Sequence, residues 1–177
     1  MRRMFDAALM SGLASAIDIS FEEVVRHRDA QVLRTAYRIL GNWADAEDVA
    51  QEVFVRLHRH GLSFANEAAL GSWLYRVAVN LCLDHRRASK PSVELPELRF
   101  LGASAEAEAI RGQEKQRLMR ALAQLPVKER ASVVLREIEG LSTDEVAAAL
   151  GSSEGTVRSQ VSKAMARLRE ILSREEP

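Results

Sequence analysis

The chain has 177 residues, of which 47% are hydrophobic and 28% charged, and its formal net charge is zero. This length and balance fit a soluble protein of one domain or two small ones. The net charge of zero excludes the class of strongly basic proteins that bind nucleic acid through their overall positive charge. A single cysteine, Cys82, excludes an intrachain disulfide, and no apolar run in the sequence reaches the length of a membrane span. We therefore expect a cytoplasmic protein without membrane insertion.

Apolar residues recur along the sequence with the helical period of 3.6, and no period-2 strand pattern is present, so we expect an all-α fold. Residues 1–19 are predicted to be an N-terminal extension, in which Asp6 interrupts a weakly apolar stretch. Helices are predicted over residues 20–40, 45–60, 72–88, 108–124, 127–139, 142–150 and 154–173.

Local signals suggest where the first three helices begin and end. Gly41 is expected to end the first helix, and Asp45 to cap the start of the second. Residues 61–71, bounded by two glycines, are predicted to form a loop. Ser72 is expected to cap the third helix.

The second predicted helix has an apolar stripe that would face the core, which leaves its other side exposed. That side combines carboxylates, an amide and one valine, contributed by Asp48, Gln51, Glu52 and Val55. Such an acidic surface with an amide donor suits a basic partner. A merely solvated acidic face is the alternative.

The third predicted helix places an aromatic residue, an amide and two arginines on the side away from its apolar stripe. These residues are Trp73, Arg76, Asn80 and Arg87. Aromatic faces, amides and guanidinium groups bind unstacked single strands of nucleic acid. A tryptophan at the start of an amphipathic helix is also typical of a core residue, so Trp73 fits either role.

The sequence offers no catalytic constellation. Cys82 lies close to Asp84 and His85, but one cysteine and four scattered histidines do not build a zinc site, and we expect a buried thiol instead. A nucleophile–base pair and a phosphate-binding glycine loop are also missing from the sequence. We therefore expect no enzyme activity, no cofactor and no metal.

A change of composition divides the chain. Residues 89–106 contain two prolines, a glycine and three serines, which predicts a linker. The prediction is two small helical domains, residues 20–88 and residues 107–177, joined by a flexible tether. Fully extended, the tether would span roughly 60 Å at about 3.3 Å per residue.

The second domain is predicted to contain a helix-turn-helix. Ser142 and Glu145 form a capping box, Gly151 is suited to end the short helix that comes next, and Ser153 is suited to cap the last one. A short helix, a glycine turn and a second helix with basic residues near its start are typical of DNA-binding proteins. A helical hairpin with a solvated basic face is the alternative.

The last predicted helix has a polar and basic face opposite its apolar stripe. That face carries Arg158, Ser159, Ser162 and Lys163. Arg158 lies in the first turns, where a helix in the major groove meets base edges, and could pair with a guanine. Lys163 lies deeper in the helix and suits either a base or a phosphate.

Three segments, in this order, resemble the extracytoplasmic-function type of bacterial sigma factor, a minimal form of the sigma-70 family. Asp45–His60 (DAEDVAQEVFVRLHRH) is similar to the segment that grips core RNA polymerase. Trp73–Arg87 (WLYRVAVNLCLDHRR) is similar to the segment that melts and reads the −10 promoter element. Ala121–Glu170 is similar to the domain that reads the −35 element.

The resemblance implies a transcription initiation subunit that directs core RNA polymerase to promoter DNA and opens the −10 region without ATP. It assigns Asp48, Gln51, Glu52 and Val55 to the polymerase. It also implies that Asn80 helps to read the −10 element and that the loop Leu62–Leu70 accepts a flipped base. Family members are commonly held by an anti-sigma factor, which is expected as a further partner.

Two other classes of protein remain as alternatives. A stand-alone helix-turn-helix regulator would bind duplex operator DNA, usually as a symmetric dimer, but no dimerisation helix is evident and the acidic face would have no purpose. An enzyme with a helical sensor domain would need a catalytic constellation. Many relatives have more arginine, or an aromatic residue, where this chain has Gln160 and Ser162, so the −35 sequence is not predicted.

Overall fold

The computed structural model describes residues 19–88 and 105–174, and every regular element in these two ranges is helical. An N-terminal bundle contains α2 (Phe21–Leu40), α3 (Trp43–His60) and α4 (Glu67–Ala88). A C-terminal bundle contains α5 (Ala105–Ala123), α6 (Val127–Val133), the π-helical turn η1 (Val134–Ile138), α7 (Thr143–Leu150) and α8 (Glu154–Arg174). The predicted extension 1–19 and linker 89–106 lie almost entirely outside the described residues, apart from Ile19 and the start of α5.

The N-terminal bundle forms because each helix buries one apolar stripe. Ser20 and Glu23 make a capping box at the start of α2, and Gly41 ends that helix with a φ of 77°. The stripe of α3 is buried as its spacing predicts, at Ala46, Val49, Ala50, Val53, Phe54 and Leu57. Together with α4, these helices enclose a continuous apolar core.

Two predicted helix starts in this bundle are wrong. Asn42 caps α3 instead of Asp45, because the Asn42 side chain accepts from the Asp45 amide at 3.0 Å. α4 begins at Glu67 instead of Ser72, because Asn66 accepts from the Ala69 amide at 2.8 Å and starts the helix earlier. The predicted loop 61–71 therefore shortens to residues 61–66.

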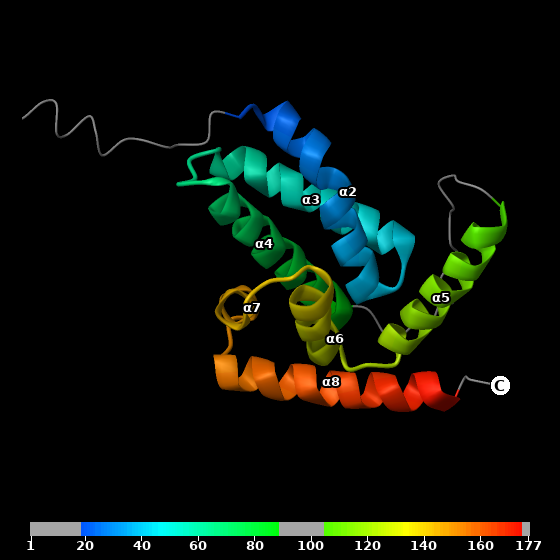
Figure 1. Ribbon diagram of the computed structural model, residues 1–177. Helices are drawn as coiled ribbons and strands as arrows, with labels where there is room; N and C mark the ends of the chain where they lie inside the picture. The colour runs from blue at the N-terminus through cyan, green and yellow to red at the C-terminus, as the bar shows by residue number, and fades with distance from the viewer. Residues whose placement is uncertain (1–18, 89–104, 175–177) are drawn as a thin grey trace, which may run out of the picture.

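The C-terminal bundle contains the predicted helix-turn-helix. Ser142 and Glu145 make both bonds of a capping box, and Gly151 ends α7 with a φ of 57°. Ser153 accepts from the Thr156 amide at 3.1 Å at the start of α8. In Figure 1, α8 runs along the outer side of this bundle, with α6 and α7 between it and the N-terminal helices.

The predicted single helix 127–139 is wrong in its second half. After α6 the chain widens into the π-helical turn η1, where the amide of Glu139 bonds the carbonyl of Val134, five residues earlier. A π-helical turn contains about one residue more than an α-helical turn, so the residues after it are rotated about the helix axis. The Glu139 side chain therefore points to a different side than it would in a regular α-helix.

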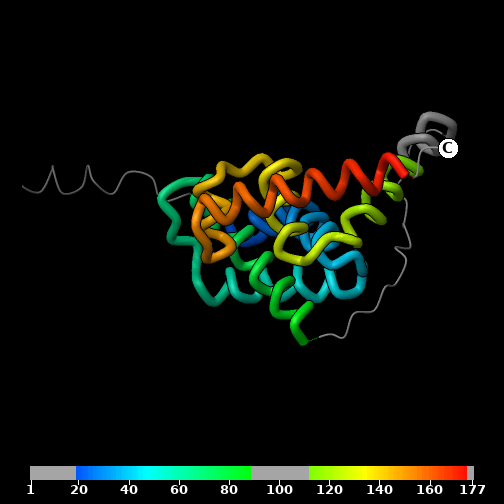
Figure 2. Tube along the Cα trace, turned by 90° about the horizontal axis from the view of Figure 1, so that it is seen from below, coloured from blue at the N-terminus to red at the C-terminus, as the bar shows by residue number. Residues whose placement is uncertain are grey.

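The two bundles pack against each other in the described structure, and Figure 2 shows them as one body with α8 across its face. α7 and α6 lie against α4, and α2 contacts α5, α6 and η1. α4 is consequently buried on two sides, one within its own bundle and one against the C-terminal bundle. The sequence predicted both bundles but not this contact between them.

Candidate nucleic-acid interface

The acidic side of α3 is exposed, as predicted from its apolar stripe. Asp48, Gln51 and Val55 are exposed, and Val55, at 42%, is the most exposed large apolar residue in the part of the chain that the structure describes. The Glu52 side chain is 40% exposed and pairs with Arg56 at 2.8 Å. This internal pair was not predicted, although its i, i+4 spacing is visible in the sequence.

Beside this acidic side lies a groove of about 530 Å³ between α2 and α3. Its walls are mainly apolar, and Gln51 and Val55 of the acidic side are among the residues that line it. The lining residues are Phe21, Val25, Asp29, Gln51, Phe54, Val55, His58 and Arg59. Only the pairing of α2 with α3 creates this groove, so the sequence pattern of either helix does not reveal it.

The four residues predicted to bind DNA on α4 lie together on one side of the helix. Arg76, Asn80 and Arg87 are exposed, and Trp73 is half-buried. Arg87 pairs with Asp84 of the same helix at 2.9 Å. Because α4 is buried on two other sides, this remaining side is a narrow polar strip between two packed surfaces.

Trp73 belongs to an aromatic cluster at the end of this strip. Its ring centroid lies 5.0 Å from that of His60 and 5.9 Å from that of Phe64, and His60 stacks on Phe64. The loop expected to accept a base was placed at Leu62–Leu70, but Leu70 is a buried residue of α4. Only residues 61–66 of the glycine-bounded stretch lie outside a helix.

The predicted basic face of α8 is exposed along its whole length. Arg158, Ser159, Ser162 and Lys163 are all exposed, opposite the buried Val157, Ala164 and Leu168. The guanidinium of Arg158 donates to the Glu154 carboxylate at 2.5 Å, one turn back. The four residues therefore share a face that a groove of DNA can reach.

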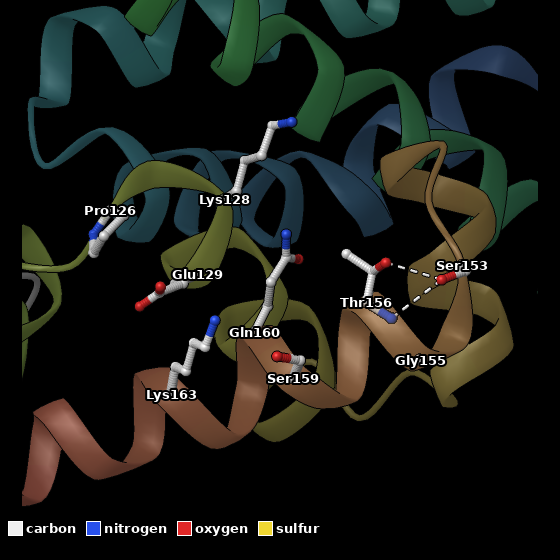
Figure 3. Close-up of a pocket in the computed structure, with 9 residues that line it drawn as sticks. All are labelled: Pro126, Lys128, Glu129, Ser153, Gly155, Thr156, Ser159, Gln160 and Lys163. Carbon is white, nitrogen blue, oxygen red and sulfur yellow. Dashed lines mark hydrogen bonds between the residues drawn. The ribbon is translucent and has the colours of Figure 1, made fainter.

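A hollow of about 620 Å³ adjoins this face, between the start of α6 and the start of α8 (Figure 3). Lys128, Gln160 and Lys163 contribute to its wall. The Ser132 hydroxyl lies 2.6 Å from the Gln160 amide oxygen and holds that side chain in place. Lys128 and Gln160 were not predicted as site residues, because only tertiary packing brings α6 beside α8.

The buried ionisable groups are structural. Cys82 is fully buried, as predicted, and burial raises the pKa of its thiol to about 12. Burial lowers the pKa of Arg130 to about 10. Among residues 19–88 and 105–174, no cluster of three or more His, Cys, Asp or Glu residues could hold a metal ion, and no helix there is long and apolar enough to cross a membrane.

Comparison with known proteins bears on the roles of these faces. The model of sigma-70 region 2 matches residues 24–91, and that of sigma-70, region 4 matches residues 115–168. The ECF RNA polymerase sigma factor SigM of Mycobacterium tuberculosis is 34% identical over 170 residues, covering 94% of this chain and 84% of that protein. The RNA polymerase sigma-E factor of Streptomyces avermitilis is 38% identical over 154 residues, covering 87% of this chain and 86% of its own. The chain belongs to the extracytoplasmic-function sigma factors of the sigma-70 family.

Solved structures agree with this assignment. CnrH in complex with the cytosolic domain of CnrY is 26% identical, covers 97% of this chain and 99% of its own, and superimposes with a TM-score of 0.65. The sigma factor RpoE of Bartonella quintana, in complex with the anti-sigma factor NepR, has the same fold at a TM-score of 0.68 and 22% identity, over 88% of this chain and 98% of its own. This sigma factor thus directs core RNA polymerase to promoter DNA, and the predicted resemblance and all-α fold class are confirmed.

Proposed function

We propose that this sigma factor divides initiation among three helix faces. The acidic side of α3 binds core RNA polymerase, the polar strip of α4 opens and reads the −10 element, and the basic face of α8 reads the −35 element. The observation that carries this proposal is that each face is exposed on a separate helix, within a bundle that its own family model matches. Apart from Trp73, which packs against the apolar core, the residues of these faces are not committed to holding the fold together.

The side of α3 suits a basic helical partner. Asp48 and Glu52 supply negative charge, Gln51 can donate or accept, and Val55 adds apolar contact beside the α2–α3 groove. Charges at the rim of an interface steer the encounter, while apolar residues near its centre slow dissociation. The exposed Val55 therefore gives this acidic surface an apolar centre, from which the binding of polymerase excludes water.

The strip of α4 suits a separated strand better than a duplex. Asn80 presents an amide to the edge of an unpaired base, and Arg76 and Arg87 can hold phosphates. The aromatic cluster around Trp73 offers a ring on which an unstacked base can lie. Binding of the single strand drives melting, so the strip needs no ATP.

The face of α8 suits the major groove of duplex DNA. Arg158 can make two hydrogen bonds to a guanine once it leaves Glu154. Ser159 and Ser162 are short enough to let the helix approach the bases, and Lys163 supplies a charge for a phosphate.

In this proposal the protein is not an enzyme, because the polymerase performs the chemistry. It acts in the bacterial cytoplasm and reaches the nucleoid when bound to polymerase. An anti-sigma factor is its expected inhibitor. The Bartonella RpoE is solved with an anti-sigma factor, and CnrH is solved with the cytosolic domain of CnrY.

The test is transcription from a library of promoter sequences with purified core polymerase. We expect initiation only when the protein and core are both present, with enrichment of paired elements near −10 and −35. A stand-alone operator-binding regulator would instead bind duplex DNA tightly without core. That result, or initiation that does not depend on this protein, would contradict the proposal.

A further inference from the structure

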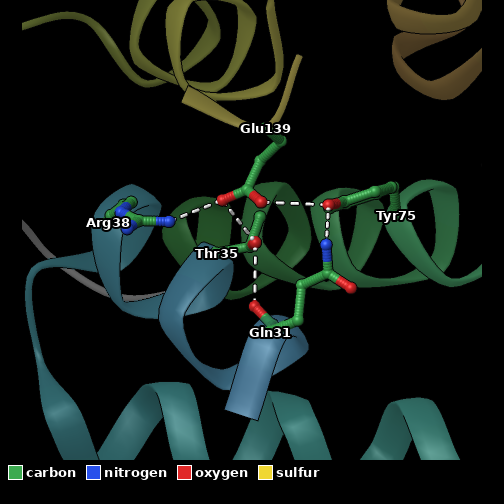
Figure 4. A network of polar contacts seen from close by, with 5 residues as sticks. All are labelled: Gln31, Thr35, Arg38, Tyr75 and Glu139. Carbon is green, nitrogen blue, oxygen red and sulfur yellow. Dashed lines mark hydrogen bonds and ion pairs between the residues drawn. The ribbon is translucent and has the colours of Figure 1, made fainter. Parts of the chain in front are cut away.

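The carboxylate of Glu139, which comes directly after η1 in the C-terminal bundle, is enclosed by side chains of the N-terminal bundle (Figure 4). Only 6% of the Glu139 side chain is exposed. Arg38 of α2 donates to Oε1 at 2.6 Å, and the hydroxyl of Tyr75 of α4 donates to Oε2 at 2.9 Å. The Thr35 hydroxyl lies 2.9 Å from Oε1. Both oxygens of this carboxylate therefore bind donors from the other bundle.

Two further polar contacts join the bundles. The guanidinium of Arg130, 2% exposed, donates to the Ile39 carbonyl at the end of α2 at 2.7 Å. The Ser72 hydroxyl of α4 donates to Glu145 of α7 at 3.4 Å. Hydrogen bonds of this kind exchange for bonds to water at a small net cost, so an interface anchored by them can open and close.

The packed arrangement cannot serve both promoter elements at once. A compact chain of this length has a radius of gyration of about 16 Å, which corresponds to a body roughly 40 Å across. The −10 and −35 elements are separated by about 25 base pairs, or roughly 85 Å at about 3.4 Å per base pair. With the bundles packed, α4 and α8 lie too close together to reach both elements.

We infer that the contacts of Glu139 with Thr35, Arg38 and Tyr75 form a latch, which holds this sigma factor in an autoinhibited closed state until the two bundles separate. The inference rests on the proposed roles of the α4 and α8 faces. These faces stay exposed in the closed state, so the inhibition is geometric: each face is accessible, but the two cannot be used together. A molecule in the closed state binds the paired promoter elements only after opening, and the closed fraction reduces its apparent affinity.

The first experiment locks the closed state covalently. Cysteines replace Ser72 and Glu145, which contact each other across the two bundles, and a short, reducible bis-methanethiosulfonate reagent links them in the full-length chain. The reagent is needed because the contact is made by the end of the long glutamate side chain, so it does not bring the two Cβ atoms to disulfide distance. The native Cys82 is buried and does not compete. With core polymerase on a promoter that has both elements, we expect the linked form to lose initiation and the same sample to regain it after the link is reduced. Equal initiation by the two forms would overturn the inference.

The second experiment weakens the latch without a crosslink. Glu139→Gln keeps the side-chain shape but removes the charge that Arg38 pairs with, and Glu137→Gln makes the same change at an exposed position of η1. Spin labels on α3 and α8 report the distance between the bundles. We expect Glu139→Gln to increase the separated population, and to lower the apparent Kd of the two-element complex by about fivefold or more, as expected for an allosteric coupling of ordinary size. Glu137→Gln should change neither.

If Glu139→Gln and Glu137→Gln give the same distances, the latch does not hold the bundles together. This outcome differs from a failure of the proposed function, in which the wild-type protein itself would not support initiation with core. The distance measurement needs neither polymerase nor DNA, so it tests the latch even then. If the reagent fails to link the two cysteines, and the spin labels show a separated population in the wild type, the closed state is likewise overturned.

Discussion

The guanidinium of Arg130 in α6 donates to the carbonyl of Ile39 at 2.7 Å, although 91 residues separate them. The same group donates to the Ala123 and Leu125 carbonyls at 2.5 and 3.1 Å. Ile39 lies at the C-terminal end of α2, where helix carbonyls are otherwise unpaired and cations are favoured. One buried arginine therefore closes the turn before α6 and caps a helix of the other bundle.

Arg130→Ala should lower the free energy of unfolding by about 3 kcal/mol or more, because it leaves several buried carbonyls without donors and opens a cavity. Urea unfolding monitored by circular dichroism measures the change. Arg130→Lys should recover little of this free energy, because the single ammonium nitrogen of lysine cannot donate to three carbonyls that are arranged around a planar guanidinium. A loss below about 0.5 kcal/mol would mean that water replaces the guanidinium at no cost.

The ionisation of Tyr75 should report whether the bundles are packed. Burial, followed by the Glu139 carboxylate, raises the pKa of Tyr75 above its ordinary range, and Arg28 acts weakly in the opposite direction. The folded protein holds the Tyr75 phenol proton more tightly than the unfolded chain does. The protonated phenol therefore stabilises the folded state fully below about pH 10, and this stabilisation is lost as the pH rises toward the pKa of the folded protein. Glu139→Gln should lower the pKa of Tyr75.

Near-ultraviolet titration of the phenolate in a Tyr37→Phe background measures this pKa. The background is needed because burial also raises the pKa of Tyr37. An unchanged Tyr75 titration in Glu139→Gln would show that burial by other groups alone sets the pKa.

Charge reversal on α3 should weaken binding to core polymerase. Glu52→Lys removes a negative charge from the proposed interface and places a second cation beside Arg56. We expect a Kd at least about tenfold higher in a fluorescence titration of labelled protein with core. Glu22→Lys, an exposed reversal on α2, serves as the control and should bind as the wild type does. Equal affinities of the two variants would remove Glu52 from the interface.

Loss of the Asn80 amide should impair promoter opening more than promoter binding. Asn80→Ala should keep its affinity for core but initiate poorly on duplex templates, because one contact to the unpaired strand is missing. The defect should shrink on templates mismatched at −10, where unstacking is already partly accomplished. Gln113→Ala, an exposed amide on α5, is the control. A defect of the same size on both templates would argue against a role in melting.

Base readout by α8 should depend on Arg158. Arg158→Ala should cost about 1–3 kcal/mol on the preferred −35 sequence and flatten the sequence preference of holoenzyme in a binding selection. Arg174→Ala is a matched control, because Arg174 also pairs with a glutamate four residues back at 2.5 Å on the same helix. If both variants behave alike, Arg158 does not read bases.

Lys163→Ala should behave differently from Arg158→Ala. If Lys163 holds a phosphate, its loss weakens all −35 sequences alike and lowers the slope of log affinity against log salt by about one. A change of sequence preference without a change of salt slope would assign Lys163 to a base instead.

The helices and most of their caps could be predicted from the sequence. Each capping box joins residues three apart, as at Ser142 and Glu145, and each apolar stripe repeats within one helix. Such interactions are complete within a few neighbouring residues, so their pattern is visible without the fold. The exposure of Asp48, Asn80 and Arg158 agrees with the same periodicity. The misplaced starts of α3 and α4 show its limit, because asparagines at residues 42 and 66 competed with equally plausible caps.

The contact between the bundles was decided only by the tertiary structure. Glu139 bonds Thr35 across 104 residues, and the π-helical turn that orients it has no sequence signal comparable to a capping box. The groove between α2 and α3 and the hollow between α6 and α8 likewise need two packed helices. Helix formation depends on a residue's near neighbours, whereas burial and pairing of a charge depend on which distant surfaces meet. The sequence by itself therefore determined the helices and the family, and tertiary packing determined which charged side chains are exposed to partners and which join the two bundles.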